Sequence, residues 1–323
     1  MLPAGANDKA TLTAAGSTFV EPLLRRWIDA YKAVAPGVTI NYEGVGSPAG
    51  VDRLKAGQGD FFTSDMPLSQ VEEATEGGAQ EFYQLPWAAG AIALPYNLPD
   101  VPVLQLAPDT VGAIFAGRVQ RWDDPFIRRD NPDVRLPSTA ITLVYRTEAS
   151  GTTAVFTAYL EAASYGQWSL GTSRTSRFPR GQGARGSEGV ANAVKATTGA
   201  IGYTQLGLAE KAGLKVVSLG NRANRFIQPT PEAVNAAMAG ALLREHGTTA
   251  TLYFTPEAPA AYPLATLSYL IYRRTGLDEA KAAALRHFAS WALTEGQRFA
   301  ENLGYAPVPR QFVPPALSAL DRS

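Results

Sequence analysis

An α/β fold is predicted for this chain of 323 residues by the pattern of its apolar side chains. Short apolar runs typical of buried strands alternate with longer amphipathic runs typical of helices. Three of the turns that lead from a predicted strand into a predicted helix carry Ser or Thr beside Gly. The alternation favours parallel sheets, and the length is sufficient for two domains. The three turns are therefore the candidates for a binding site.

The first of these turns is Ala15–Phe19 (AGSTF), which precedes a run with apolar residues at helical spacing. The second is Gly44–Gly50 (GVGSPAG), which follows a predicted strand at Val38–Tyr42. It precedes a short helix with Val51 and Leu54 on its inner face. Each turn alone is typical of a capped helix. Three together could bring three helix N-termini, with their unpaired N–H groups, to one anion.

The third turn, RTEASGTT, begins at Arg146 directly after a predicted strand at Ile141–Tyr145. The guanidinium of Arg146 is a planar fork of N–H donors that matches a tetrahedral oxyanion. Hydroxyl groups of Ser150, Thr152 and Thr153 add donors at the start of the following helix. The alternative is an ordinary Ser N-cap with a solvated Arg nearby.

A carboxylate joins these donors. Phe61–Ser64 is predicted to be a short buried strand, and Asp65 follows its last residue. An ionised Asp only accepts hydrogen bonds, so an anion that carries a proton can donate to it. A fully ionised anion would meet an unpaired negative charge instead. Phosphate has such a proton at neutral pH and sulfate has none. The structural alternative is an Asp that caps the next turn.

The remaining elements follow the same rhythm. We expect a polar helix around Gln70–Glu76 and extended apolar segments at Phe82–Leu85 and Gly90–Leu94. A Pro-rich stretch then leads into a helix near Val111–Phe115, and Glu279–Leu303 has the spacing of one or two packed amphipathic helices.

These motifs together resemble the phosphate-binding protein of the high-affinity bacterial phosphate ABC transporter, the PstS family. The resemblance runs from about Leu12 to Val313 and rests on order and spacing. The segments that carry it are AAGSTFVEPLLRRW, NYEGVGSPAGVDRL, DFFTSDMPLS, IFAGRVQRWDDP, NPDVRLPS, RTEASGTTAVFTAYL and GAIGYTQL. Each is weak alone, and the set is highly specific.

The resemblance implies a set of phosphate contacts. Backbone N–H groups and hydroxyls donate to the ligand, Asp65 accepts its proton, and Arg146 donates to it and pairs with Asp65. The implied contact residues are Thr18, Phe19, Ser47, Asp65, Arg146, Ser150, Gly151 and Thr152. Residues implied to support them are Ser17, Glu148 and Thr153.

Four positions depart from the commonest family pattern. Ser17 stands in place of Ala, Pro48 in place of a small flexible residue, and Tyr145 in place of Arg. Glu148 stands in place of the Asp that positions the binding arginine in the family. Its longer side chain is expected to shift the affinity or the discrimination against arsenate without abolishing binding.

The resemblance also implies a type II periplasmic binding protein with two α/β lobes, central mixed sheets and a hinge of two segments. We place the crossings near Ala88–Pro95 and Tyr262–Ile271. Lobe I then comprises residues 1–89 and 268–323, and lobe II comprises residues 90–267. The phosphate cleft is expected between the lobes, which close on the ligand by hinge motion.

Composition excludes several other classes. Lys plus Arg and Asp plus Glu number 29 each, so no basic excess favours nucleic acid or an anionic membrane. Cys is absent, which rules out disulfides and thiolate chemistry. We expect a monomer without cofactor or metal, whose partners are inorganic phosphate and the permease subunits of the transporter. The resemblance implies export to the periplasm or cell envelope, with a signal peptide absent from this sequence; a lipid anchor stays open.

Other functions were weighed against this one. A Ser/Thr-dependent enzyme resembling a phosphatase would need a base, and neither histidine lies in a motif of the cleft. A binder of sulfate or molybdate conflicts with Asp65, and a sensor on the same scaffold stays open. The glycine-rich segment Gly181–Gly189 lacks the pattern of a phosphate-binding loop, so we interpret it as a structural loop before a helix that begins near Gly189, close enough to the cleft for a supporting role.

Overall fold

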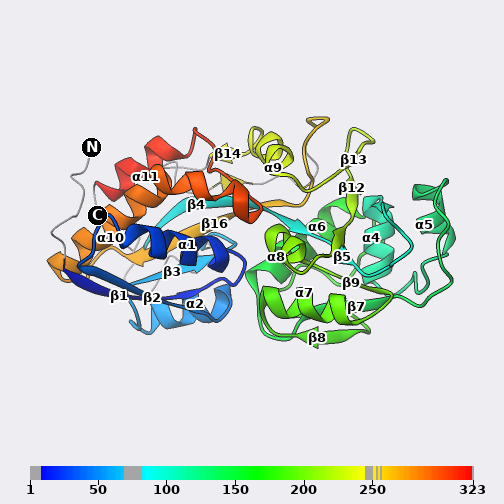
Figure 1. Cartoon of the computed structure of the whole chain (residues 1–323), viewed down its shortest axis with the longest axis horizontal. Coiled ribbons are helices and arrows are strands. Elements are labelled where there is room, and N and C mark those ends of the chain that lie inside the picture. Colours follow the sequence, from blue (N-terminus) through cyan, green and yellow to red (C-terminus); the bar gives the residue numbers. More distant parts are fainter. Residues whose placement is uncertain (1–8, 69–81, 244–249, 252–253, 255–256, 322–323) are drawn as a thin grey trace.

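Two lobes lie side by side along the long axis of the molecule (Figure 1). The structure is a computed structural model that describes residues 9–68, 82–243, 250–251, 254 and 257–321. We call lobe I the elements around a seven-stranded sheet, and lobe II the elements around a five-stranded sheet and a smaller three-stranded one. Both large sheets are mixed, which confirms the predicted fold class.

Lobe I is built on three parallel strands, β1 (Ala10–Gly16), β2 (Val38–Gly44) and β3 (Phe61–Ser64). Two long strands from distant parts of the chain, β4 (Phe82–Ala93) and β16 (Ala265–Arg273), continue this sheet. The strand order is β10-β4-β16-β3-β1-β2, so β16 lies between β4 and β3. The helices of the lobe are α1 (Glu21–Tyr31), α2 (Ser47–Lys55), α10 (Glu279–Leu293) and α11 (Val313–Leu320).

The helices of lobe I form where the sequence predicts them. In α1, Leu23, Leu24, Trp27 and Tyr31 are buried at helical spacing, and a proline occupies the first turn, where its missing N–H has no intrahelical partner to lose. The C-terminal run gives α10 followed by two short 3-10 helices, η2 (Glu295–Phe299) and η3 (Glu301–Leu303). The expected helix at Gln70–Glu76 lies outside the described residues.

Lobe II has a sheet in the order β11-β5-β9-β7-β8. Its strands are β5 (Pro95–Tyr96), β7 (Thr142–Arg146), β8 (Gln182–Ala184), β9 (Ala200–Gly202) and β11 (Lys215–Val216). Its helices are α4 (Pro108–Phe115), α5 (Pro125–Asp130), α6 (Gly151–Ala163), α7 (Gly186–Ala196) and α8 (Leu206–Lys211). The three-stranded sheet contains β6 (Gln105–Leu106), β12 (Ser218–Gly220) and β13 (Phe226–Ile227).

The interpretation of Gly181–Gly189 as a loop was partly wrong. Gln182–Ala184 forms the edge strand β8, parallel to β7, and α7 begins at Gly186 instead of near Gly189. The strand β8 consists of three small or polar residues, so it lacks the alternation of apolar side chains from which a strand is predicted. Its position comes from the pairing with β7.

The lobes are joined by a two-stranded ribbon. β4 and β16 pair in antiparallel register from Ala265 opposite Ala91 to Arg273 opposite Phe82, with a shift between Ser268 and Tyr269. β4 leads directly into β5 of lobe II. The chain returns from lobe II to this sheet at β10 (Thr204–Gln205), which pairs with the end of β4. The connection is therefore held by main-chain hydrogen bonds.

Three further elements lie near this ribbon. Helix α9 (Pro231–Met238) contacts β4, β16 and β17 (Tyr305–Ala306), so it packs on lobe I although the chain reaches it from lobe II. β14 (Leu242–Leu243) and β15 (Ala250–Thr251) form a small hairpin-like pair in the same part of the molecule (Figure 1). None of the helices in the described residues has both the length and the apolar composition needed to span a bilayer.

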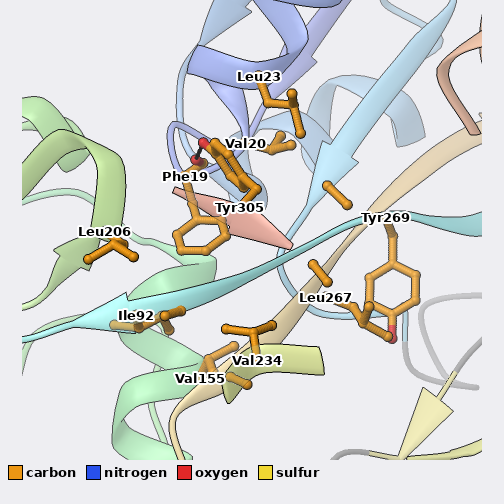
Figure 2. Packing of buried hydrophobic residues seen from close by; sticks show 14 of the residues in the cluster. Phe19, Val20, Leu23, Ile92, Val155, Leu206, Val234, Leu267, Tyr269 and Tyr305 are labelled. Carbon is orange, nitrogen blue, oxygen red and sulfur yellow. Dashed lines mark hydrogen bonds between the residues drawn. The ribbon is translucent and has the colours of Figure 1, made fainter. Parts of the chain in front are cut away.

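The larger of two apolar clusters in the described residues extends from one lobe to the other, and the smaller one lies between β7, β9 and α7 of lobe II. Figure 2 shows the larger cluster along β4, from Phe19 and Tyr305 to Ile92 and Leu206. The rings of Phe19 and Tyr305 meet edge to face at 5.9 Å, and the Tyr305 hydroxyl donates to the Phe19 carbonyl at 2.5 Å. This contact fixes the backbone just before α1, where the first predicted turn lies.

Candidate anion-binding site

The three predicted turns meet between the lobes. Thr152, at the start of α6, donates through its hydroxyl to Asp65 Oδ2 at 3.0 Å. Ser47 opens α2 so close to Gly151 that a Cβ built on Gly151 would lie 2.4 Å from Ser47 Oγ. Only glycine fits at that position without displacing Ser47. Each turn follows the carboxyl end of a strand, where binding sites of open α/β sheets form.

Asp65 is held entirely by hydroxyl groups. Ser17 Oγ donates to Asp65 Oδ1 at 2.5 Å and Ser268 Oγ lies 3.5 Å from the same oxygen, while Thr152 binds the other oxygen. The residue is 3% exposed. Burial raises the pKa of the Asp65 carboxyl above its usual value, although the hydrogen bonds and the charge of Arg146 act against this. The carboxyl is thus suited to share a proton.

Arg146 is paired with Glu148 instead of the predicted Asp65. Its Nε donates to Glu148 Oε1 at 2.7 Å, and its Nη2 donates to the same oxygen. Among the described residues this is the ion pair that Arg146 makes, and none joins it to Asp65. Glu148 lies two residues after Arg146, and its side chain reaches back over the turn. The Arg146 side chain is 2% exposed, so the pair is largely shielded from water.

Glu148 has the opposite electrostatic character to Asp65. Burial alone would raise the pKa of Glu148, but the charge and hydrogen bonds of Arg146 outweigh it and lower that pKa below the usual value. Its Oε1 also accepts from the backbone N–H of Gly186 at 3.0 Å. The anionic form of Glu148 is therefore favoured, and it fixes the guanidinium edge formed by Nε and Nη2.

The first turn of α6 is capped as the sequence predicts. Ser150 Oγ accepts from the Thr153 N–H at 3.3 Å, and Thr153 Oγ1 contacts the Tyr203 hydroxyl at 2.8 Å. The Ser150 N–H donates to the Arg174 carbonyl at 2.8 Å, so it is already used within the protein. The Phe19 N–H is likewise used, because it donates to Ser17 Oγ at 3.0 Å. These two backbone groups were predicted as ligand donors, and in this structure both have partners in the protein.

Ser187 is a residue of this network that was not among the predicted site residues, as are Ser268 and Tyr203. Ser187 is 1% exposed and lies in the first turn of α7. Its hydroxyl accepts from Arg146 Nη1 at 3.3 Å and lies 3.0 Å from Thr18 Oγ1. The signal was present, because Gly186–Ser187 is a fourth pair of Gly and Ser that opens an amphipathic helix.

A groove of about 850 Å³ lies on the outer side of this contact, between α1, α7 and α8. Thr18, Gly186 and Ser187 form part of its wall. The side chains of Asp65 and Arg146 are buried and do not line this groove. Within the described parts of the chain, no group of three or more His, Cys, Asp or Glu side chains could hold a metal ion.

The two mixed sheets and the buried polar site between them define a two-lobed substrate-binding protein. A family model described as a PBP superfamily domain matches residues 3–295. Phosphate-binding protein PstS 3 of Mycobacterium leprae is 33% identical over 311 residues, which cover 94% of this chain and 84% of that protein. The chain belongs to the PstS family of phosphate-binding proteins.

Solved structures share the fold at lower identity. A high-affinity periplasmic phosphate-binding protein bound with phosphate (PfluDING) superposes with a TM-score of 0.75 at 21% identity and covers 96% of this chain and 93% of its own. An ABC-type phosphate transport receptor from Vibrio cholerae has a TM-score of 0.59 at 19% identity, with 91% and 99% covered.

Proposed function

We propose that this chain captures inorganic phosphate between its lobes and delivers it to the permease of an ABC transporter. The observation that carries the proposal is Asp65, a buried carboxyl with a raised pKa beside two helix N-termini and an arginine. A site for a fully ionised anion gains nothing from such a group, whereas a protonated phosphate can donate to it. Family membership supports the same ligand.

The donors for phosphate come from both lobes. Arg146 has five N–H groups, and the contacts within the described residues use one on Nε, one on Nη2 and one on Nη1. One N–H on each terminal nitrogen remains to grip two phosphate oxygens. We propose that Thr18, Ser47, Gly151 and Thr152 supply the other donors, and that the start of α6 adds the positive end of its dipole.

The lobe boundaries are proposed to lie within the ribbon. We place the crossings at residues 89/90 and 267/268, inside the paired strands β4 and β16. Bending of this ribbon opens the cleft, and phosphate enters before the lobes close. We infer that the protein acts outside the cytoplasmic membrane, as the periplasmic PfluDING does, and that it works as a monomer without binding nucleic acid.

Binding without chemistry fits the site better than catalysis. Ser150 Oγ accepts an N–H and has no histidine partner among the described contacts, and Thr152 donates to Asp65. Ser150 thus lacks the base that an activated serine needs, and the acceptor of Thr152 is the carboxyl proposed to bind the phosphate proton. The relatives are binding proteins of transporters, and this chain is proposed to share that role.

Titration calorimetry on protein stripped of phosphate tests the proposal. Phosphate at pH 7 is expected to bind one to one with a Kd of about a micromolar or lower, roughly −8 kcal/mol or better. Sulfate at the same concentration is expected to give no heat of binding. If both anions bind equally, the role of Asp65 as selector is wrong, and if neither binds, the proposed function is wrong.

A further inference from the structure

We propose that Ser187 is a positioning residue that holds the closed lobes together and directs the Thr18 hydroxyl proton to the bound phosphate. The inference rests on the proposed function. It concerns a residue outside the predicted contact set, which was read from the three earlier turns. Ser187 connects Arg146 of lobe II to Thr18 of lobe I through hydrogen bonds.

The connection consists of three side chains. Arg146 Nη1 donates to Ser187 Oγ at 3.3 Å, and Ser187 Oγ lies 3.0 Å from Thr18 Oγ1. The Ser187 N–H also donates to Thr18 Oγ1, at 3.2 Å. Ser187 belongs to α7 of lobe II, and Thr18 lies between β1 and α1 of lobe I. Both bonds to Thr18 therefore form only when the lobes are closed.

The direction of these bonds follows from charge. A hydroxyl that accepts from a cation becomes a stronger donor, because hydrogen bonds in a chain polarise one another. Ser187 accepts from Arg146, so its own proton points to Thr18 Oγ1. Thr18 then accepts two hydrogen bonds from Ser187, which occupies both lone pairs of its hydroxyl oxygen. Its own proton is left to donate, and an anion is the partner it requires.

The position of Ser187 is itself fixed from two sides. Thr204 Oγ1 donates to the Ser187 carbonyl at 2.8 Å. The neighbouring Gly186 N–H donates to Glu148, which also holds Arg146. Glu148 thus binds the guanidinium at Nε and Nη2, and Ser187 binds it at Nη1. Ser187 also contacts Thr18 of lobe I. Any shift of Arg146 toward phosphate is transmitted to Thr18.

The first test is the dissociation rate of phosphate. Ser187→Ala is expected to raise the dissociation rate roughly tenfold, the effect of losing one hydrogen bond near a charge. The association rate should stay within about twofold, because the open form lacks the contact. Ser187→Thr keeps the hydroxyl and should restore most of the affinity. Ser164→Ala is the matched control, since Ser164 is also fully buried in lobe II and its hydroxyl accepts from the Trp168 N–H in the turn that follows α6, away from Thr18 and Arg146.

A double-mutant cycle tests whether Ser187 acts through Thr18. Thr18→Val removes that hydroxyl at a partly exposed position and should fold even if the Ser187 variant is less stable. If the inference holds, Thr18→Val combined with Ser187→Ala binds no more weakly than Thr18→Val alone. Additive losses would overturn it, as would wild-type dissociation in Ser187→Ala. Failure of the wild-type protein to bind phosphate would instead overturn the proposed function, on which this inference rests.

Discussion

Each lobe brings one carboxylate to the site, and the surroundings of the two carboxylates shift their pKa values in opposite directions. In lobe I, the side-chain donors that Asp65 meets within the described residues are hydroxyl groups, and its pKa is raised. In lobe II, Glu148 meets the guanidinium of Arg146 and its pKa is lowered. Environments that separate the pKa values of two like groups assign them different roles. Under the proposed function, Asp65 accepts a proton from the ligand, and Glu148 is a counter-ion that orients the guanidinium of Arg146.

The largest effect is expected from breaking the lobe II pair. Arg146→Met removes the cation, so the phosphate affinity should fall on the order of 100-fold. A loss of at least tenfold is the minimum that the proposed contact requires. The substitution also leaves Glu148 without its cation. Because the Glu148 side chain is only 23% exposed, we expect the free energy of unfolding to fall by about 2 kcal/mol. Calorimetry and urea denaturation measure the two losses.

A double variant separates the loss of phosphate affinity from the loss of stability. Arg146→Met combined with Glu148→Met removes both charges, so it should regain much of the stability while the affinity stays low. If the double variant binds phosphate like the wild type, Arg146 is not part of the site.

A smaller effect is expected from the lobe I carboxylate. Asp65→Asn keeps the shape but can donate, so phosphate should bind roughly tenfold more weakly while sulfate binding becomes measurable. Titration of both anions at pH 7 gives the ratio of their affinities. An unchanged ratio would show that the selection does not depend on the proton acceptor. Asp60→Asn, which alters another buried carboxylate of lobe I that pairs with Lys281, serves as the control.

The smallest effect is the pH dependence of stability, and its sign differs between the lobes. Because the folded-state pKa of Asp65 is raised, its contribution is greatest at low pH and is lost as the pH rises through the folded pKa. Asp65→Asn should therefore gain stability relative to the wild type as the pH rises above the usual carboxyl range, by up to about 1.4 kcal/mol per pH unit.

Glu148 should behave in the reverse sense. Its folded-state pKa is lowered, so its contribution is present above the unfolded pKa and is lost as the pH falls through the folded one. The deficit of Glu148→Gln should shrink on acidification. Urea denaturation of the three proteins from pH 3 to 8 in phosphate-free buffer gives both curves. Parallel curves would contradict the contrast between the lobes.

The local parts of the site were the predictable ones. β3 has the predicted bounds, Asp65 follows it, and Ser150 caps α6, because strand ends and N-caps depend on neighbouring residues. The expected pair of Arg146 with Asp65 was wrong, whereas Glu148 holds Arg146 as the resemblance implied. The choice between the two carboxylates depends on distances set by the whole fold. Ser187 was missed since its importance lies in contacts with residues far away in sequence.

The same division applies to the fold. The alternation of strands and helices was enough to predict the fold class, and two extended segments around residues 82–94 became the single strand β4. The position of β16 between β3 and β4 could not be predicted from neighbouring residues. It depends on which strands of the sheet have an unpaired edge when β16 joins it. The contact roles of the predicted site residues stay predictions until ligand binding is measured.

The position of β16 determines when during folding the site can exist. β3, which carries Asp65 at its end, has β1 on one side and β16 on the other, and β16 ends at Arg273. Lobe I therefore cannot complete its sheet until most of the chain has been synthesised, whereas the main sheet of lobe II, β5 to β11, is complete by Val216. Pairing between such distant segments is slow, because a long loop must close first. The half of the site with the fixed cation is thus assembled before the half that selects the ligand, and a chain shortened before β16 would retain Arg146 but lose the framework of Asp65.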